Sequence, residues 1–168
     1  MIQVYTGNGK GKTTSALGLG LRTIGANKKV LLIQFLKDGL SSELKAIKKI
    51  KNFDVKVFGK KGFVLKNKIS QKDFDLAEQG FNFAQKAIAS KKYDLIILDE
   101  INIAIYFGLL KEKDVIDLIK KTPSKTELIL TGRRASKKII QLADLVTEMK
   151  ATKHYFKKGI KMRKGIEY

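Results

Sequence analysis

The residues best suited to chemistry form a glycine-rich segment near the N-terminus. Residues 7–14 read GNGKGKTT, after a short apolar run and before a segment with helical periodicity. Glycine tolerates the tight curve that turns backbone N–H groups toward a phosphate. In such a loop Lys12 reaches the phosphates and the Thr13 hydroxyl binds Mg²⁺, beside the N-terminal dipole of the next helix. We therefore expect a nucleotide to be bound by Thr6, Gly7, Asn8, Gly9, Lys10, Gly11, Lys12, Thr13 and Thr14.

This loop differs from two common phosphate-binding patterns. The pattern G-x-x-x-x-G-K-[ST] needs glycine at Thr6, but here the glycine is displaced to Gly7. The dinucleotide pattern G-x-G-x-x-G would need glycine at Lys12. A chance glycine–lysine turn is the alternative, and the position between a predicted strand and a predicted helix favours a phosphate loop. The sequence therefore predicts a variant P-loop.

Two carboxylates follow the most apolar strand segment of the chain. Residues 95–100 read LIILDE, so Asp99 and Glu100 end a buried strand. P-loop proteins use a carboxylate at this place to hold or orient the metal, which makes Thr13, Asp99 and Glu100 candidate ligands of Mg²⁺ or Mn²⁺. The alternatives are a helix N-cap for Asp99 and a solvated first-turn residue for Glu100.

Two arginines follow another predicted strand, over residues 127–130. The carboxyl ends of parallel strands meet at one edge of the sheet, where open α/β sheets bind their ligands. We therefore expect Arg133 to lie near the phosphates. An ordinary surface pair with Arg134 is the alternative.

Strands and helices alternate along the chain, which predicts βαβ units. The fold class we expect is α/β, a three-layer P-loop NTPase-like fold with a mainly parallel central sheet flanked by helices. Predicted strands cover residues 2–5, 29–36, 55–58, 93–98, 127–130 and 145–149, and predicted helices cover 13–26, 41–51, 71–89, 111–121 and 136–144. Ser70 and Asp73 form a capping box before the longest helix. Residues 154–168 lack a helical period and are expected to be an edge strand or loop.

The composition fits one compact P-loop domain over residues 1–168. Hydrophobic residues make up 43% of the chain, and no segment approaches the roughly 18 consecutive apolar residues of a membrane span. Met1 leads directly into the first predicted strand, so we expect no signal sequence, no membrane partner and a cytoplasmic protein. The chain has no cysteine, which excludes disulfides, thiolate metal sites and cysteine nucleophiles.

The formal net charge of +19 has two interpretations, a nucleic-acid-binding surface or a solvated basic surface. The 35 basic residues include only four arginines, and the lysines are spread over nearly every predicted helix and loop. Nucleic-acid sites usually recruit arginine for bidentate contacts and interleave aromatic residues. The dispersed lysines favour a solvated surface, so we do not expect nucleic acid to be the partner.

Over essentially its full length the chain resembles the ATP:corrinoid adenosyltransferases of the P-loop type. The displaced glycine of the loop is a feature of that family. The matching segments, in order and with compatible spacing, are residues 6–14 (TGNGKGKTT), 34–37 (QFLK), 98–100 (LDE), 130–133 (LTGR), 142–154 (LADLVTEMKATKH), 159–161 (GIK) and 165–168 (GIEY).

The resemblance implies a reaction in cobalamin biosynthesis or salvage. The Co(I) centre of a reduced corrinoid, cobalamin or a precursor, attacks the 5′ carbon of ATP and expels triphosphate. Because the corrinoid is the nucleophile, the protein has to supply orientation and charge neutralisation. The resemblance thus implies catalytic roles for Lys10, Lys12 and Arg133 at the triphosphate. It also implies a homodimer and a reductase that supplies Co(I).

Three further residues gain candidate roles from the resemblance. Phe63 matches a family residue that faces the corrin, whereas Leu65 stands where the family has tryptophan. Glu148 lies in a matching segment and either contacts the ribose or supports a residue that does. The alternatives are an ordinary core or loop aromatic for Phe63 and a solvated strand residue for Glu148. His154 could be an axial cobalt ligand, but a lone histidine after a strand is more often a hydrogen-bonded structural residue.

Two other functions are compatible with a variant P-loop. One is a nucleic-acid-stimulated ATPase that uses the basic surface, and the other is a small-molecule kinase that releases ADP. The identity of the product separates these alternatives from an adenosyltransferase.

Overall fold

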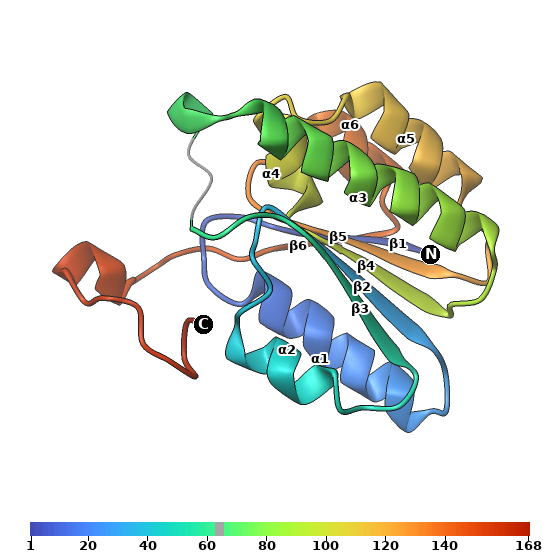
Figure 1. Cartoon of the computed structure of the whole chain (residues 1–168), viewed down its shortest axis with the longest axis horizontal. Coiled ribbons are helices and arrows are strands. Elements are labelled where there is room, and N and C mark those ends of the chain that lie inside the picture. The colour runs from blue at the N-terminus through green and yellow to red at the C-terminus, as the bar shows by residue number, and fades with distance from the viewer. Residues whose placement is uncertain (63–65) are drawn as a thin grey trace.

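The computed structural model describes residues 1–62 and 66–168, which are built around a six-stranded sheet (Figure 1). The order across the sheet is β3-β2-β4-β5-β1-β6, and each neighbouring pair is parallel. The predicted α/β fold with a mainly parallel sheet is therefore confirmed. The strands are β1 (Ile2–Thr6), β2 (Val30–Phe35), β3 (Phe53–Phe58), β4 (Leu95–Asp99), β5 (Glu127–Thr131) and β6 (Leu145–Glu148).

Helices cover both faces of the sheet, which gives the expected three layers. In Figure 1, α1 and α2 lie on one face, and α3, α4, α5 and α6 lie on the other. The helices are α1 (Lys12–Gly25), α2 (Ser42–Ile47), α3 (Gln71–Ala89), α4 (Ile101–Tyr106), α5 (Glu112–Lys121) and α6 (Lys137–Leu142), with short 3₁₀ helices η1 (Lys66–Lys68) and η2 (Tyr155–Lys158).

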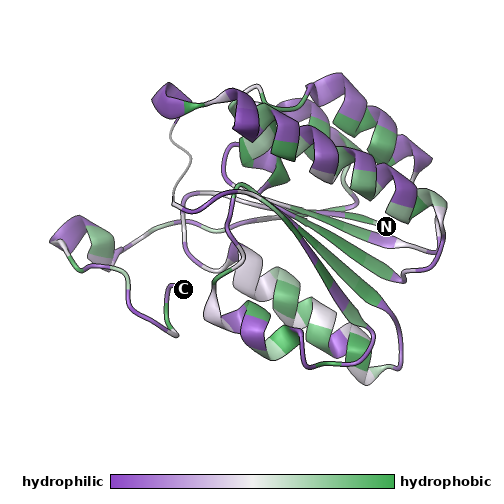
Figure 2. Cartoon of the chain, in the orientation of Figure 1, coloured by the Kyte–Doolittle hydropathy of each residue, from purple (hydrophilic) through white to green (hydrophobic). Residues whose placement is uncertain are grey.

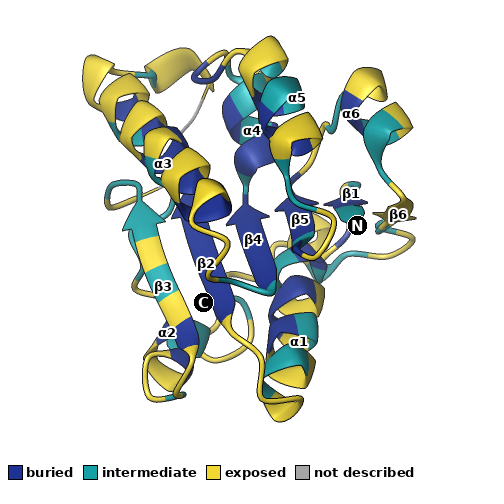
Figure 3. Ribbon diagram, turned by 90° about the vertical axis from the view of Figure 1, so that its right-hand side faces the viewer, coloured by how far each residue is buried: buried dark blue, intermediate teal, exposed yellow. Residues whose placement is uncertain are grey.

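The central strands are apolar throughout because both of their faces are buried. In β2, Leu31 and Ile33 pack in the core under α3, whereas Val30 and Leu32 pack in the core against α1 and α2. Figure 2 shows the hydrophobic strands between helices of mixed polarity, and Figure 3 shows β2, β4 and β5 as the most buried part of the sheet. This double burial is the physical reason for the continuous apolar runs in the sequence.

The capping box predicted before α3 is present. The Asp73 carboxylate accepts hydrogen bonds from the Ser70 N–H at 2.8 Å and from the Ser70 hydroxyl at 2.7 Å. Lys60 adds an ion pair at 2.6 Å. Burial alone would raise the pKa of Asp73, but the bonds from Lys60 and Ser70 lower it below its ordinary value. The start of α3 is therefore fixed by local side-chain contacts.

The structure adds one helix, shortens another and settles the form of the C-terminal segment. The helix predicted over residues 41–51 is shorter, since α2 ends at Ile47. No element was predicted over residues 101–106, where the structure has α4; its sequence INIAIY is rich in β-branched residues, and packing against the sheet overrides that preference. Residues 154–168 were expected to be an edge strand or loop, and they are a loop that contains η2, while β6 is the edge strand.

The strand order creates a switch point at the carboxyl edge of the sheet. After β1 the chain crosses by α1 to β2, which is separated from β1 by β4 and β5. The loop after β1 therefore faces the ends of β4 and β5 at the same edge. Open α/β sheets bind their ligands at switch points of this kind.

Within the part of the chain that the structure describes, each helix is too short or too polar to cross a bilayer.

The contact between α3 and the sheet can be tested at a glycine. A Cβ at Gly80 would lie 2.8 Å from Cε1 of Phe35 and 3.0 Å from Cγ of Phe58, whereas Gly18 in α1 faces open space. Gly18→Ala should raise the free energy of unfolding by about 0.5–1 kcal/mol through helix propensity. Gly80→Ala should lower it by about 1–2 kcal/mol through overpacking. Urea unfolding of both variants measures the difference, and equal stabilisation would contradict the close packing of α3.

Candidate active site

The glycine loop curves against the backbone that follows β6. Gly7 and Gly11 have positive φ angles of 93° and 115°. A Cβ would lie 2.5 Å from the carbonyl oxygen of Met149 at Gly7 and 2.7 Å from it at Gly9. The Gly9 N–H donates to that same oxygen at 2.6 Å. Glycine is therefore required in this loop by the close approach of a second segment as well as by backbone conformation.

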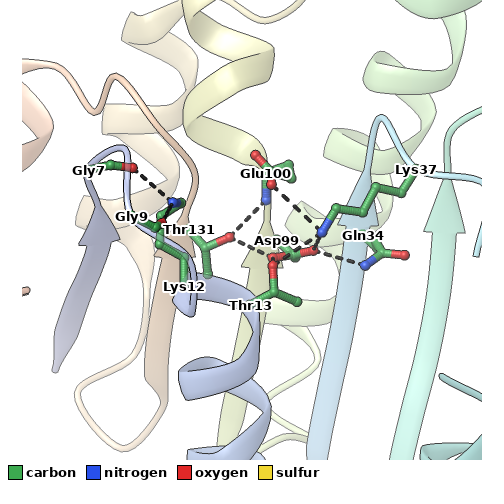
Figure 4. A network of polar contacts seen from close by, with 9 residues as sticks. All are labelled: Gly7, Gly9, Lys12, Thr13, Gln34, Lys37, Asp99, Glu100 and Thr131. Atoms are coloured by element: carbon green, nitrogen blue, oxygen red, sulfur yellow. Dashed lines mark hydrogen bonds and ion pairs between the residues drawn. The ribbon is translucent and has the colours of Figure 1, made fainter. Parts of the chain in front are cut away.

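The side chain of Lys12 lies inside the curve of the loop, where it is 8% exposed. Its ammonium donates to the carbonyl oxygen of Gly7 at 2.8 Å and to that of Gly9 at 2.6 Å (Figure 4). Burial lowers the pKa of Lys12; the charge of Glu100 opposes this shift, and the charge of Arg133 adds to it. The predicted phosphate-binding lysine thus lies at the centre of the predicted loop.

A fully buried carboxylate, Asp99 at the end of β4, ties the loop helix to the sheet. Its Oδ1 accepts hydrogen bonds from the hydroxyls of Thr13 at 2.8 Å and Thr131 at 2.7 Å. Its Oδ2 accepts from Gln34 Nε2 at 2.9 Å and from Lys37 Nζ at 2.8 Å. Figure 4 shows these four donors around the carboxylate. The N-cap position of α4 belongs to Glu100, so the N-cap alternative for Asp99 is wrong.

The surroundings of Asp99 keep it charged. Burial by itself would raise the pKa of this carboxyl, but the charge and hydrogen bond of Lys37, with the bonds from Thr131 and Gln34, hold it below its ordinary value. The pKa of Lys37 is raised in turn: burial opposes its charge, and the attraction of Asp99 and Glu100 outweighs burial. The two groups form an ion pair at the carboxyl edge of the sheet, with Nζ and Oδ2 2.8 Å apart.

Sequence reasoning missed three of the four donors to Asp99. Gln34 and Lys37 lie in the segment QFLK and Thr131 lies in LTGR, and no role was assigned to any of them. A signal was available, since each residue lies at or just after the carboxyl end of a predicted strand. Parallel strands bring such ends together at one edge. The position of Lys37 against Asp99 still required the strand order, which places β2 beside β4.

Glu100 adopts a left-handed backbone conformation, with φ of 63°. Its N–H donates to the Thr131 hydroxyl at 3.0 Å, and its Oε1 lies 3.7 Å from Lys37 Nζ. Burial and the neighbouring charge of Asp99 raise the pKa of Glu100. Its side chain is 23% exposed, so the alternative of a solvated first-turn residue does not describe it.

The two arginines after β5 face different neighbours. Arg133 lies two residues after the end of β5, at the carboxyl edge of the sheet, and its charge lowers the pKa of both Lys12 and Glu100. The guanidinium of Arg134 lies 5.5 Å from the ring centroid of Tyr106 in α4. Both arginines are exposed. The approach of Arg133 to the phosphates stays a prediction.

The remaining loop candidates lie in or beside the glycine loop. Thr6 is 8% exposed, and its hydroxyl accepts a hydrogen bond from the Ala135 N–H at 3.3 Å. Glu148 pairs with Thr6 in the sheet register, and its Cγ lies 3.0 Å from the position of a Cβ at Gly7. Asn8, Lys10 and Thr14 are exposed at the rim.

Two residues, Phe63 and His154, were considered as contacts of the corrinoid. Phe63 lies outside the described residues, as does Leu65, so its contact with the corrin stays a prediction. His154 accepts a hydrogen bond from the Phe156 N–H on Nδ1 at 3.2 Å and caps η2. This contact fits the structural role that the sequence favoured for His154.

The oxygen donors beside the loop suit a hard divalent cation. Across residues 1–62 and 66–168, no cluster of three or more His, Cys, Asp or Glu side chains could hold a metal. Mg²⁺ does not require such a cluster, because it is usually held by one or two carboxylates together with phosphate oxygens and waters. The Thr13 hydroxyl and the Glu100 carboxylate are donors of that kind, and Asp99 orients Thr13 at 2.8 Å. The Lys37 ammonium lies 3.2 Å from the Thr13 hydroxyl and 3.7 Å from Glu100, so a bound cation would displace it from these oxygens.

A parallel α/β sheet with a glycine loop, a lysine inside that loop and a carboxylate at the end of a neighbouring strand defines a P-loop nucleotide-binding protein. The family model described as ATP:corrinoid adenosyltransferase BtuR/CobO/CobP matches residues 1–168. The chain belongs to this family, and its activity is the transfer of the adenosyl group of ATP to a corrinoid. The predicted family, the class of enzyme and the two substrates are confirmed.

Three relatives show the extent of the similarity. The corrinoid adenosyltransferase of Pseudomonas aeruginosa is 37% identical over 170 residues, covering 100% of this chain and 83% of that protein. The Escherichia coli K12 corrinoid adenosyltransferase is 31% identical over 168 residues, with 100% and 85% coverage. The corrinoid adenosyltransferase CobA of Salmonella typhimurium is 30% identical over 168 residues, with 100% and 85% coverage.

The ion pair between Lys37 and Asp99 predicts a pH-dependent loss of stability in Lys37→Met. Removing the ammonium leaves a buried carboxylate with neutral donors only, so the free energy of unfolding should fall by about 2–3 kcal/mol at pH 7. In the wild type the pKa of Asp99 is lower in the folded protein than in the unfolded chain, where it is about 3.9. The ionised carboxylate therefore stabilises the fold at pH values above about 3.9, and this stabilisation is lost as the pH falls through the pKa of the folded state.

In Lys37→Met burial raises the pKa of Asp99 instead, so the stability gap to the wild type should narrow as the pH falls toward about 4. Urea unfolding between neutral and acidic pH measures this gap. Lys138→Met is the matched control, since Lys138 pairs with Glu112 on the surface. A gap that stays constant with pH would argue against the buried ion pair.

Proposed function

We propose that this chain transfers the 5′-deoxyadenosyl group of ATP to the Co(I) centre of a reduced corrinoid, cobalamin or one of its precursors, and releases triphosphate. The electron pair of Co(I) forms the cobalt–carbon bond to C5′. The C5′–oxygen bond breaks, and its electron pair remains on the triphosphate. The observation that carries the proposal is the Lys12 ammonium inside the glycine loop. A cation there stabilises the charge that develops on the leaving group.

The chain's own residues contribute charge and orientation. We assign catalytic roles to Lys12, which would exchange its two loop carbonyls for phosphate oxygens, and to Lys10 and Arg133 at the rim of the loop. No protein nucleophile is needed, because the corrinoid supplies the attacking electron pair. This agrees with a sequence that has no cysteine and a single histidine, which caps η2.

The nucleotide and the corrinoid would contact different parts of the site. We propose that residues 6–14 bind the phosphates, that Glu100 and Glu148 bind the ribose or orient groups that do, and that Phe63 faces the corrin. Glu148 is suited to this role because it lies beside Gly7.

A divalent cation, Mg²⁺ or Mn²⁺, is proposed to bind at Thr13 and Glu100 together with phosphate oxygens. Asp99 was also a candidate ligand, but both of its carboxylate oxygens accept hydrogen bonds from protein donors, so we propose that it acts by fixing the Thr13 hydroxyl. When bound, such an ion neutralises charge on the triphosphate and orients it.

The test is an anaerobic incubation of the protein with ATP, Mg²⁺ and chemically reduced cob(I)alamin. The visible spectrum should show a light-sensitive alkylcobalamin, and triphosphate should be released in equal amount. Release of ADP in place of triphosphate would indicate a kinase or ATPase instead. Hydrolysis that depends on added DNA or RNA would indicate that the basic surface serves nucleic acid.

Lys12→Ala should abolish turnover while leaving the fold intact. Loss of one charge-stabilising donor at the leaving group costs about 100-fold or more in rate. Single-turnover formation of alkylcobalamin measures the effect, and circular dichroism checks the fold. The exposed Lys72→Ala in α3 is the control and should keep wild-type activity. A Lys12→Ala protein with full activity would overturn the assignment of the loop.

The biological setting follows from the substrates. We propose that residues 1–168 act as one domain in the cytoplasm, where ATP is available, and that a reductase supplies the Co(I) corrinoid. Because Co(I) is a strong reductant, the transfer would have to follow reduction directly.

We also propose that the chain forms a homodimer through β6 and the segment after it. β6 ends the strand order, so its outer edge is free for pairing within the described sheet. Leu145 and Val146 are 45% and 41% exposed. A two-fold axis beside an edge strand pairs the same surface of both copies. Other exposed large apolar residues nearby in sequence are Phe156, Ile160, Met162, Ile166 and Tyr168.

Leu145→Lys should convert the dimer to a monomer, because it places a charge on the proposed interface of two chains that already carry +19 each. Size-exclusion chromatography with light scattering at physiological salt measures the mass. Phe74→Lys is the control, since Phe74 in α3 is similarly exposed, at 40%, and should not affect the dimer. A wild-type protein that is monomeric under these conditions would contradict the proposal.

A further inference from the structure

The C-terminal segment, residues 154–168, turns back toward the start of α1 (Figure 1). Two of its side chains contact Lys10 of the glycine loop. The Lys10 ammonium lies 2.9 Å from the Tyr155 hydroxyl and 3.0 Å from Oε1 of Glu167. The Tyr155 hydroxyl also donates to that carboxylate oxygen. Lys10, at the rim of the loop, is thus held by two side chains that lie 145 and 157 positions away in the sequence.

Glu167 is fixed by its own turn as well as by Lys10. Its Oε2 accepts from the Arg163 N–H at 2.6 Å, and its Oε1 lies 3.2 Å from Arg163 Nη2. The Gly165 N–H donates to the Tyr168 carbonyl at 2.7 Å, and the Ser42 hydroxyl donates to the same carbonyl at 3.0 Å. The turn is therefore anchored to α2. The Glu167 side chain is 12% exposed, because these neighbouring groups cover most of its surface.

The other two lysines of the site also have fixed positions. Lys12 binds loop carbonyls, and Lys37 pairs with Asp99. Lys10 differs because it is exposed at the rim, with its side chain 43% accessible. A free lysine at such a position loses much conformational freedom when it binds a phosphate. Contacts that restrict it beforehand reduce this loss.

The contacts of Lys10 leave it able to bind an anion. An ammonium has three N–H donors, and Tyr155 and Glu167 use two of them. The charges of Lys10, Glu167 and Arg163 sum to +1, so the cluster as a whole still attracts phosphate. We propose that Tyr155 and Glu167 are positioning residues that hold the Lys10 ammonium at the rim of the loop for contact with the triphosphate group. This inference rests on the proposed function only in placing a triphosphate at the loop.

The opposite relationship would be competition, in which the Glu167 carboxylate occupies Lys10 in place of a phosphate. The two relationships predict opposite signs for Glu167→Gln, which keeps the shape of the side chain and removes its charge. Positioning predicts weaker binding of a triphosphate, and competition predicts tighter binding.

The test measures binding of inorganic tripolyphosphate by calorimetry, without corrinoid or ATP. Glu167→Gln and Tyr155→Phe should each weaken binding, up to about tenfold for Glu167→Gln. Glu112→Gln is the matched control, because Glu112 pairs with Lys138 on the surface of α5 and α6, and it should bind as the wild type does. Unfolding midpoints check that the variants fold. If Glu167→Gln does not fold, Tyr155→Phe provides the test.

A double-mutant cycle with Lys10→Met shows whether the two residues act through Lys10. In the Lys10→Met background, Glu167→Gln should have no further effect on binding. An additive effect there, or unchanged or tighter binding by Glu167→Gln alone, would overturn the inference. The readout involves no cobalt, so a protein that binds tripolyphosphate as expected but forms no alkylcobalamin would contradict the proposed function and not this one.

Discussion

The buried carboxylate of Asp99 is the interaction on which the site depends. Burying a charged group lowers the stability of the fold by several kcal/mol unless nearby hydrogen-bond donors compensate for the lost water. The four donors come from the start of α1, from β2 and the residues after it, and from β5. Satisfying one carboxylate therefore fixes the loop helix relative to three strand ends. The same contacts orient Thr13 and place the Lys37 ammonium beside Glu100.

Steric contact with the segment after β6 explains the unusual loop. Thr6 is still a strand residue, paired with Glu148, so the position that carries glycine in the common pattern continues β1 here. The turn begins one residue later, at Gly7, where the backbone first has positive φ. Met149 then lies so close to Gly7 and Gly9 that a side chain at either position would collide with it. The displaced glycine is thus a consequence of how β6 packs beside β1.

Three of the many lysines are held in specific positions at the carboxyl edge of the sheet. Most lysines are dispersed over the surface, as the sequence suggested, and a general basic surface needs no particular ligand. Lys10, Lys12 and Lys37 differ because each has specific partners that hold its ammonium near the loop. For an enzyme whose leaving group is an anion, a few oriented cations contribute more than many mobile ones.

The sequence by itself determined the loop, its lysine and hydroxyl, the paired carboxylates and the alternation of strands and helices, because these depend on neighbouring residues and on burial patterns that repeat along the chain. The family followed from the same segments. Only the tertiary structure decided that Lys37, Gln34 and Thr131 bind Asp99. It also decided that the Met149 backbone lies against Gly7 and Gly9, and that Tyr155 and Glu167 contact Lys10. These contacts join residues between 32 and 157 positions apart. The strand order and the path of the C-terminal segment set them, and local sequence patterns encode neither.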